Sequence, residues 1–278
     1  MIGKVWFVTG AGSGIGAGTV KAAIKAGDRV VATGRSLDKL RRALGDETEN
    51  LFFVQLDVTD ETQAKAAVDR AVQRFGRIDV LVNNAGYSLL GNFEELSIPE
   101  MERLFATNFW GVAYVMRAVL PVMRKQRAGH IINISSTAGA VGLKHCSAYS
   151  ATKFAVEGLS LATATEVEQF GVKVTLVEPG FFLTDLLAAS NAKYADSTIA
   201  DYAAEGPAEA MWSPYDGKQT GSPDKLGDAL VELTHMANPP QVFVGGSDGL
   251  AMVIPAVEAR LKDIRDHDVL SRTTDIAS

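Results

Sequence analysis

The sequence predicts an α/β protein built on one doubly wound parallel sheet of about seven strands, with helices on both faces. From residue 1 to about 180, short apolar runs rich in β-branched residues alternate with longer segments of helical period. Several of the runs contain almost no polar residue, which is typical of parallel strands covered on both faces. No repeat, charged tail or Gly/Ser linker divides the chain, so residues 1–278 are expected to form a single domain.

This alternation places the individual elements. The predicted strands are residues 5–9, 29–33, 51–55, 80–82, 130–134, 173–177 and 241–244. The predicted helices are residues 14–26, 37–44, 61–75, 99–126, 148–170, 224–237 and a terminal amphipathic helix at 255–268. Asp60 and Ser97 precede the helices at 61–75 and 99–126 as N-terminal caps, and Gly27 and Gly76 end the helices at 14–26 and 61–75 in the left-handed conformation.

One long segment interrupts the regular pattern. Residues 181–222 follow the sixth strand, are rich in Ala, Tyr and Asp, and contain Pro207 and Pro214. Connections of this length are uncommon in compact domains and are often functional. We expect this segment to be a substrate-binding lid within the single domain.

Composition argues against several classes of protein. The chain has 27 basic and 33 acidic residues and a net charge of -6, so it offers no polycationic surface for nucleic acid. Its one cysteine, Cys146, rules out an internal disulfide framework and is compatible with a reducing cytoplasm. No stretch approaches the roughly 18 apolar residues of a membrane span, and the first residues lack a secretion-signal pattern. We expect a cytoplasmic protein without nucleic-acid or membrane partners.

The first motif that carries chemistry is TGAGSGIG at residues 9–16, between the first predicted strand and the first predicted helix. Glycines there allow a tight turn and let the backbone approach a pyrophosphate, which binds the free N–H groups of the helix N-terminus. The spacing and the strand-turn-helix context predict a Rossmann-type dinucleotide site rather than a merely structural turn. The predicted cofactor contacts are Gly10, Gly12, Ser13, Gly14, Ile15 and Gly16.

The end of the second strand indicates which dinucleotide binds. A site for NAD(H) usually has a carboxylate here for the ribose 2′-hydroxyl, whereas a 2′-phosphate requires a cation. Gly34 stands at the carboxylate's place and Arg35 follows it, which favours NADP(H) over NAD(H). The alternative is that Arg35 is a solvated residue at a helix cap.

Two further loops border the same site. Asp57, after the third strand, could accept a hydrogen bond from the adenine amino group or, equally well, cap the turn that follows it. The NNAG sequence at residues 83–86 follows the fourth strand, where small residues let the backbone run close to a ligand and asparagine can join two strand ends. We expect Asn84, Ala85 and Gly86 to contact the cofactor.

Ser136, Tyr149 and Lys153 are the candidates for catalysis. Tyr149 and Lys153 lie four residues apart on a predicted helix, so their side chains share one face. A phenol has a pKa of about 10 and becomes a useful base when a neighbouring cation favours the phenolate. Tyr149 would exchange a proton with the substrate oxygen during hydride transfer, while Ser136 hydrogen-bonds to that oxygen, and no metal is needed. The alternative is that Tyr149 and Lys153 are an ordinary helix pair.

Together, TGAGSGIG, NNAG, the spacing from Ser136 to Tyr149, YSATK at 149–153 and the Pro-Gly turn at 179–180 resemble the short-chain dehydrogenase/reductase family, over essentially the whole chain. The resemblance implies a catalytic tetrad in which Asn108, in TNFWG, joins the three candidates by holding a proton-relay water beside Lys153. It also implies that Lys153 binds the nicotinamide ribose. The cofactor contacts that it implies include Asp57, Val58, Tyr149, Lys153, Pro179, Gly180 and Thr184.

The resemblance further implies an oligomer and a branch of the family. Members assemble as homodimers or homotetramers through helices equivalent to residues 99–126 and 148–170, whose apolar content here exceeds what one sheet face can cover. The stretch VFVGGSDGLAMVIP is similar in general layout to the branch with 17β-hydroxysteroid and retinol dehydrogenases. One departure is Gly12, where the family commonly has serine; its loss removes a hydroxyl from the turn but leaves the backbone argument intact.

The residues expected around the substrate are mostly apolar and predict a hydrophobic ketone or secondary alcohol. The candidate pocket walls are Tyr87, Leu89, Val141, His145, Phe181, Phe182, Leu183, Leu186 and Leu187. For the Phe and Leu residues, core packing is an equally good interpretation. His145 is expected to be an exposed loop residue rather than a substrate contact.

The sequence therefore predicts an NADP(H)-dependent carbonyl reductase or alcohol dehydrogenase. Two other functions compete with this prediction. GGSDG at residues 245–249 satisfies the G-x-S-x-G pattern of a hydrolase nucleophile elbow, with Ser247 as the nucleophile. A hydrolase needs an acid and a histidine on later strand ends, but only His267 follows, in the last predicted helix. The second competitor is a non-catalytic NADP(H)-binding redox sensor, which would need the glycine turn but not the tetrad.

Overall fold

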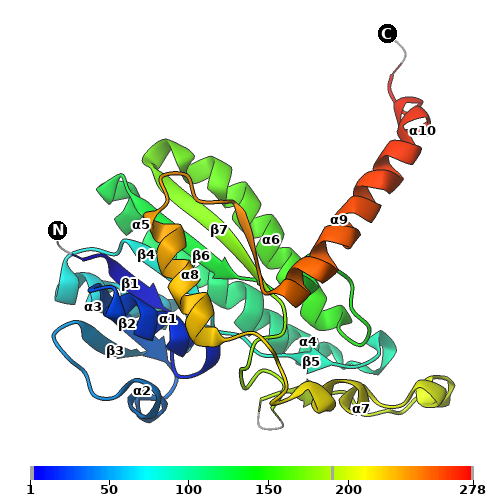
Figure 1. The fold of residues 1–278 in the computed structure, drawn as a ribbon, viewed down its shortest axis with the longest axis horizontal. Coiled ribbons are helices and arrows are strands. Elements are labelled where there is room, and N and C mark those ends of the chain that lie inside the picture. Colours follow the sequence, from blue (N-terminus) through cyan, green and yellow to red (C-terminus); the bar gives the residue numbers. More distant parts are fainter. Residues whose placement is uncertain (1–2, 189–190, 277–278) are drawn as a thin grey trace.

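The computed structural model of the protein describes residues 3–188 and 191–276. Seven parallel strands form one sheet in the order β3-β2-β1-β4-β6-β7-β9, and helices cover both of its faces (Figure 1). The strands are β1 (Val5–Val8), β2 (Arg29–Gly34), β3 (Leu51–Gln55), β4 (Val80–Asn83), β6 (Gly129–Ile134), β7 (Val172–Pro179) and β9 (Val242–Gly245). The doubly wound α/β fold predicted from the sequence is confirmed.

Each face of the sheet has its own core. Helices α3 (Glu61–Phe75), α5 (Gly111–Gln126) and α6 (Ser147–Val167) pack on one face, and α1 (Gly14–Lys25), α2 (Leu37–Leu44) and α8 (Pro223–His235) pack on the other. Strand side chains alternate between the two cores, so that Phe7 faces the first and Trp6 the second. Because both faces are buried, these strands read as continuous apolar runs in the sequence.

The predicted N-terminal caps and C-terminal glycines of the helices are confirmed by the structure. Asp60 and Ser97 accept hydrogen bonds from N–H groups in the first turns of α3 and α4 (Ile98–Phe105). Gly76, at φ +78°, and Gly27, at φ +84°, leave α3 and α1 in the left-handed conformation. These local capping interactions do not depend on tertiary contacts, so the sequence pattern was sufficient to predict them.

Two predicted helices have different boundaries. The helix expected at 99–126 is divided by a π-helical turn at Ala106–Trp110, which separates α4 from α5. Helix α9 (Ser247–Asp266) begins well before the predicted start at 255, because Gly246 at φ +89° lets the chain turn directly from β9 into the helix. Pro255 lies inside this helix instead of opening it. A last short helix, α10 (Asp268–Arg272), follows.

The segment expected to be an irregular lid has secondary structure of its own. It contains β8 (Lys193–Tyr194), α7 (Ala208–Trp212) and 3-10 turns at Ala200–Glu205 and Ser213–Tyr215. Strand β8 pairs in parallel with β5 (Leu89–Leu90), the strand that follows β4 in the chain. The lid is therefore attached by backbone hydrogen bonds to the loop after β4.

Helices α1 and α8 cross at two glycines. A Cβ atom on Gly18 would lie 2.4 Å from the Pro223 carbonyl oxygen, and one on Gly227 would lie 2.5 Å from the Gly18 carbonyl oxygen. At these positions the helices meet backbone to backbone, which leaves no room for a side chain.

We expect Gly18→Ala to lower the free energy of unfolding by about 1–3 kcal/mol, because the added methyl must push the two helix backbones apart. Thermal unfolding followed by circular dichroism measures the effect. Gly142→Ala is the control, since a methyl at Gly142 would meet nothing within 4 Å. Equal melting temperatures for the two variants would contradict the close crossing.

Candidate active site

A cleft of about 1030 Å³ opens at the carboxyl ends of the strands, where the strand order reverses between β1 and β4. The loops after β1, β2, β3, β4, β6 and β7 all contribute to it. The predicted site residues that line it are Gly10, Gly12, Ser13, Gly14, Ile15, Arg35, Asp57, Val58, Asn84, Ala85, Gly86, Ser136, Tyr149, Lys153, Pro179, Gly180 and Thr184. Two others, Gly16 and Asn108, lie behind its wall.

The glycine turn has the geometry that its sequence indicates. Gly10 and Gly14 have φ values of +63° and +52°, which a residue with a side chain adopts only under strain. A Cβ atom on Gly14 would also lie 2.9 Å from Cγ2 of Thr184, at the start of the lid. Gly16 packs closely against the turn. A Cβ atom on Gly16 would lie 2.4 Å from the Gly10 carbonyl oxygen, so there is no room for a side chain.

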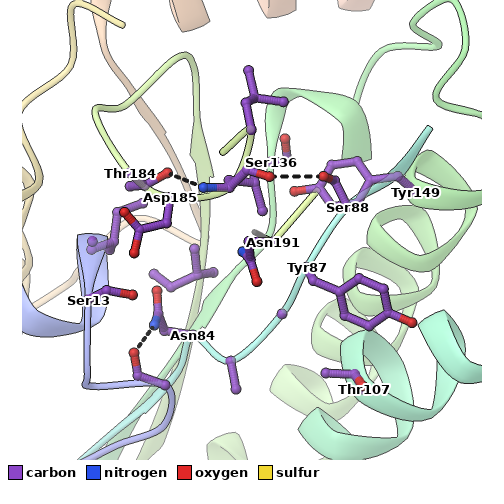
Figure 2. Close-up of a pocket in the computed structure, with 18 of the residues that line it drawn as sticks. Ser13, Asn84, Tyr87, Ser88, Thr107, Ser136, Tyr149, Thr184, Asp185 and Asn191 are labelled. Carbon is purple, nitrogen blue, oxygen red and sulfur yellow. Dashed lines mark hydrogen bonds between the residues drawn. The ribbon is translucent and has the colours of Figure 1, made fainter. Parts of the chain in front are cut away.

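Hydrogen bonds join the end of β1 to the end of β4 beneath this turn. The Thr9 hydroxyl oxygen accepts from the backbone N–H groups of Asn84 at 2.9 Å and Ala85 at 3.1 Å. In return, the Asn84 side-chain amide donates to the carbonyl oxygens of Thr9 and Gly10, at 3.0 and 3.1 Å. Figure 2 shows Asn84 in the cleft with one of its hydrogen bonds. Asn84 thus fixes the turn by its side chain, and it lines the cleft at the same time.

The start of α1 suits an anionic group. Ser13 is the N-cap residue, its side chain makes no capping hydrogen bond, and the first turn of α1 has no acidic residue. The Ser13 hydroxyl lies in the cleft beside Asn84 (Figure 2). Free N–H groups and the positive end of the helix dipole therefore face the cleft, and they fit the pyrophosphate of a dinucleotide.

The loop after β2 brings two cations to one end of the cleft. Arg35 is exposed and lines the cleft, as does Lys39 in the first turn of α2, which the sequence analysis missed. Lys39 also forms an ion pair with Asp185 of the lid, with 3.8 Å between Nζ and the carboxylate. A Cβ atom on Gly12 would lie 3.1 Å from the Lys39 side chain, so the missing serine at position 12 leaves room for this lysine. The signal in the sequence for Lys39 was its position four residues after Arg35.

Asp57 holds the turn that follows β3. Its Oδ1 accepts from the Thr59 backbone N–H at 3.0 Å and from the Thr59 hydroxyl at 2.8 Å. The turn-capping interpretation of Asp57 is therefore the one seen in the structure. Asp57 lines the cleft as well, which keeps an adenine contact open.

Ser136, Tyr149 and Lys153 meet at the centre of the cleft. Ser136 follows β6 and hydrogen-bonds to the Tyr149 phenol, while Tyr149 and Lys153 come from the first two turns of α6. Lys153 Nζ donates to the Ile134 carbonyl oxygen at 2.9 Å and lies 5.6 Å from the centre of the Tyr149 ring. The predicted triad is thus assembled, with a fixed ammonium beside the phenol.

Burial controls the protonation of this triad. It raises the pKa of Tyr149 to about 12, although the hydrogen bond from Ser136 acts in the opposite direction. Burial also lowers the pKa of Lys153 to about 8, against the attraction of Glu157, which raises it. At neutral pH Tyr149 is therefore protonated in this structure and can act as a proton donor.

Asn108 occupies the π-helical turn between α4 and α5. Its side-chain oxygen accepts from the Tyr87 backbone N–H at 3.1 Å, and its amide donates to the Tyr87 carbonyl oxygen at 3.0 Å and the Thr152 hydroxyl at 3.2 Å. The side chain therefore joins the loop after β4 to α6, next to Lys153. A π-turn widens the helix backbone, a feature that often marks functional sites.

A pair of carboxyl groups that was not predicted from the sequence lies behind Lys153. Glu157, one turn after Lys153 on α6, lies beside the Ser135 hydroxyl, and Glu178 on β7 is buried nearby. Burial raises the pKa of Glu157 to about 7, and the charge of Glu178 raises it further, while Ser135 and Lys153 lower it. Burial raises the pKa of Glu178 as well. The four-residue spacing from Lys153 was the only sequence signal for Glu157.

The wide end of the cleft is lined by apolar side chains beneath the lid. The cleft residues there include Leu89, Leu90, Leu143, Phe181, Phe182, Leu186, Leu187 and Trp212, with Tyr87 at its rim. Phe181 stacks on Tyr215, with 5.5 Å between the ring centres, and both lie close to Trp212. Ser88 donates to the Leu186 carbonyl oxygen at 3.0 Å and so holds the lid over this end.

Three predicted pocket walls do not reach the cleft. Val141, His145 and Leu183 are absent from its lining, and Leu183 is an exposed residue of the lid. His145 is buried, not exposed as expected, and has a φ of +60°. Its carbonyl oxygen accepts from the Gly91 N–H, which fixes the loop against β5 and explains why this polar loop residue is covered.

The hydrolase motif does not form a catalytic site. Ser247 is the first residue of α9, and His267 follows the last turn of the same helix, about 30 Å away along its axis. The neighbouring Asp248 instead accepts from the Phe181 backbone N–H at 2.7 Å. A Cβ atom on Gly180 would lie 2.6 Å from this carboxylate, so Asp248 is pressed against the start of the lid.

Within residues 3–188 and 191–276, no three His, Cys, Asp or Glu side chains converge in a way that could hold a metal ion. Among the helices of the same residues, none has both the length and the apolar run that a bilayer span requires.

Known proteins resemble this chain over nearly its full length. Residues 4–195 match the family model for short chain dehydrogenase. Oxidoreductase BOA17 of Botryotinia fuckeliana is 35% identical over 256 residues, which are 92% of this chain and 93% of that protein. A 3-alpha-(or 20-beta)-hydroxysteroid dehydrogenase of Mycobacterium tuberculosis is 42% identical over 187 residues, 67% of this chain and 72% of that protein.

Solved structures agree in fold and differ in cofactor. A short-chain dehydrogenase from Streptomyces avermitilis superposes with a TM-score of 0.90 and 34% identity, over 99% of this chain and 100% of that one. ElxO with NADP bound has a TM-score of 0.73 and 30% identity, over 90% and 98% of the two chains. A Burkholderia phymatum enzyme in complex with NAD has a TM-score of 0.79 and 26% identity, over 100% and 98%.

We expect Glu157→Gln to remove a pH dependence of stability. The folded-state pKa of Glu157 is raised to about 7 from an ordinary value of 4.5, so its contribution to stability is complete below about 4.5 and is lost as the pH rises through 7. The variant should match the wild type at pH 4.5 and melt at least about 2 °C higher at pH 8.

Melting curves from pH 4.5 to 8 test this expectation. Glu166→Gln, an exposed position on the same helix, is the matched control and should leave the pH dependence unchanged. A pH dependence that persists in Glu157→Gln would show that another group is responsible.

Proposed function

This chain belongs to the short-chain dehydrogenase/reductase family of oxidoreductases, and from that premise we propose that it transfers a hydride between NADP(H) and a hydrophobic ketone or secondary alcohol. Tyr149 acts as the proton donor in reduction and the acceptor in oxidation. The observation that carries this proposal is the meeting of Ser136, Tyr149 and Lys153 beside the glycine turn, in one cleft.

The mechanism uses each side chain where the structure has it. NADP(H) bound in this cleft would supply or accept the hydride. In reduction, Tyr149 gives its phenolic proton to the substrate oxygen, and Ser136, already in contact with the phenol, donates a hydrogen bond to the same oxygen. Lys153, held by the Ile134 carbonyl, stabilises the phenolate that remains and would hold the nicotinamide ribose of a bound cofactor. Asn108 keeps the loop after β4 and α6 in place around Lys153.

Two cations at the end of β2 support NADP(H) rather than NAD(H). Arg35 and Lys39 both line the cleft, and Gly34 offers no carboxylate to repel a 2′-phosphate. Related structures bind either cofactor, so the preference rests on these residues of this chain. A guanidinium in the loop after β2 and an ammonium in the first turn of α2 suit a phosphate with several acceptor oxygens.

The wide end of the cleft supports an apolar substrate. Its leucine, phenylalanine and tryptophan side chains would bind hydrocarbon or aromatic rings through burial of apolar area, beside polar groups such as Asn191 and Gln219 that also line the cleft. The hydroxysteroid dehydrogenase among the relatives fits this chemistry. We propose that the lid, residues 181–222, selects the substrate, because it supplies Phe181, Leu186 and Trp212.

A non-catalytic NADP(H)-binding redox sensor is the alternative function. Such a protein requires the glycine turn and the cations, and it has no use for a phenol hydrogen-bonded to Ser136 beside a fixed ammonium. The complete tetrad therefore favours the enzyme.

We also propose a homodimer or homotetramer that forms through the outer faces of the helices between residues 98 and 167. Trp110, Phe154 and Leu161 expose 49%, 42% and 40% of their surface there, which is a large exposed apolar area for helices of a monomer.

Tyr149→Phe should keep the affinity for NADPH and lose most turnover, by about 10²–10⁴-fold, because it removes only the transferable proton. The measurement is NADPH oxidation with a panel of apolar ketones, together with NADPH titration by fluorescence. Tyr114→Phe, on α5 and outside the cleft, is the control. Unchanged turnover in Tyr149→Phe would refute the mechanism, while tight NADPH binding without turnover of any ketone by the wild type would favour the sensor.

Arg35→Ala should weaken NADPH binding about tenfold or more and leave NADH binding nearly unchanged, since it removes one charge-assisted hydrogen bond to the 2′-phosphate. Lys39→Ala should act in the same direction. Arg41→Ala is the control, because Arg41 lies on α2 with Lys39 but pairs with Asp38 outside the cleft. Equal losses for both cofactors would contradict the role of Arg35.

Trp110→Glu should reduce the mass measured by light scattering relative to the wild type, because a charge cannot be buried in an apolar helix interface. A wild-type mass equal to one chain, 29.6 kDa, would refute assembly through these helices.

A further inference from the structure

Helix α9 leaves the body of the protein. It projects away from the sheet and carries α10 and the C-terminal end at its tip (Figure 1). Its buried residues are Gly249 and Val253, both in the first two turns, and residues 257–266 are all exposed. Most helix stability in proteins comes from packing, and isolated helices of this length are marginal in water. The outer turns of α9 therefore need a surface to pack against.

A regular apolar stripe runs along the projecting helix. It consists of Leu250, Ile254, Val257, Leu261 and Ile264, which expose between 43% and 61% of their surface. The residues are spaced alternately by four and three positions, the heptad pattern by which two helices pack side by side. The partner that matches such a stripe is another helix with the same period, and α9 itself is one.

The charges beside the stripe argue against a membrane as its partner. Residues 247–268 carry five acidic and three basic residues, so this amphipathic helix has no excess of lysine or arginine. Helices that lie on anionic lipid are rich in both. The flanks instead carry both signs, with Glu258 and Arg265 seven residues apart on one side of the stripe. A surface of this kind can be complementary to itself.

The same charges indicate the direction of pairing. In a parallel pair, Arg260 would lie across from Arg265 of the partner subunit, which brings like charges together. In an antiparallel pair centred near residue 262, Glu258 lies opposite Arg265 of the partner subunit at both ends, and Leu261 packs against Ile264 of the partner subunit. Because Gly246 joins β9 directly to α9, antiparallel packing also keeps the two bodies at opposite ends.

We propose that α9 is an association arm, which pairs antiparallel with α9 of a second copy of this chain through Val257, Leu261 and Ile264, the outer part of the apolar stripe. A pair of this kind is a two-fold interface, in which the same surface serves both subunits. It uses residues other than Trp110, Phe154 and Leu161, so it adds to whatever assembly those helices provide. It is also independent of the proposed reaction, because the stripe does not line the cleft.

Light scattering and sedimentation equilibrium of the full chain test the proposal. Leu261→Asp should halve the mass found for the wild type, whether or not the surface at Trp110 also assembles. Ala259→Asp introduces the same charge at an exposed position on the opposite side of the helix, and it should keep the wild-type mass. Both variants should keep the circular dichroism spectrum of the folded body and NADPH binding, which separates loss of pairing from loss of folding.

Charge reversal tests the direction. Glu258→Arg and Arg265→Glu should each raise the dissociation constant severalfold, and the double variant should restore it, because both pairs are rebuilt with opposite sign. A double variant that is weaker than either single one would overturn the antiparallel arrangement.

Direct contact can be tested by thiol chemistry. The native thiol, Cys146, is buried, so a cysteine placed on α9 is the accessible one. Leu261→Cys/Ile264→Cys should form intersubunit disulfides on mild oxidation, whereas Ala259→Cys should not. An unchanged mass for Leu261→Asp would overturn the proposal. The stripe would then be a membrane contact if the wild type floats with phosphatidylcholine/phosphatidylglycerol vesicles and Leu261→Asp abolishes this flotation without a change of mass.

Discussion

The hydrogen bonds between the ends of β1 and β4 are the constraint on which the rest of the site depends. A parallel sheet that reverses its order at this point leaves a crevice, but a crevice alone does not position a ligand. Thr9 and Asn84 close the gap by four hydrogen bonds between backbone and side chain, which fix the glycine turn on one side and the loop after β4 on the other. The loop then reaches Asn108 and α6, so the cofactor side and the catalytic side of the cleft share one framework.

Burial, more than any single charge, sets the chemistry of the centre. Desolvation keeps the Tyr149 phenol protonated and brings the pKa of Lys153 down toward neutrality. Glu157 and Glu178 lie behind the lysine, where burial raises both of their pKa values. The site therefore holds two groups, Lys153 and Glu157, with pKa values at about 8 and about 7, and a change at one of them alters the charge felt by the other.

Much of the molecule could be predicted from the sequence, for physical reasons that also explain the omissions. Strands buried on both faces are continuous apolar runs, and the glycine turn, Ser136, Tyr149 and Lys153 lie in short motifs whose spacing carries their geometry. Lys39, Glu157 and Glu178 were missed because their importance comes from the elements packed around them. The π-turn at Asn108 widens the helix locally without disturbing its apolar pattern. His145 was misjudged because a polar residue in a loop suggests exposure, whereas the loop here folds inward.

The contact between Asp248 and the start of the lid has a consequence for how proteins of this shape diversify. One carboxylate holds the Phe181 N–H and also occupies the first turn of α9, and Gly180 has no side chain because the carboxylate fills that space. Lid and projecting helix are thus linked through one carboxylate. A change at Gly180 or Asp248 that rebuilds the lid for a new substrate would also shift the first turn of α9.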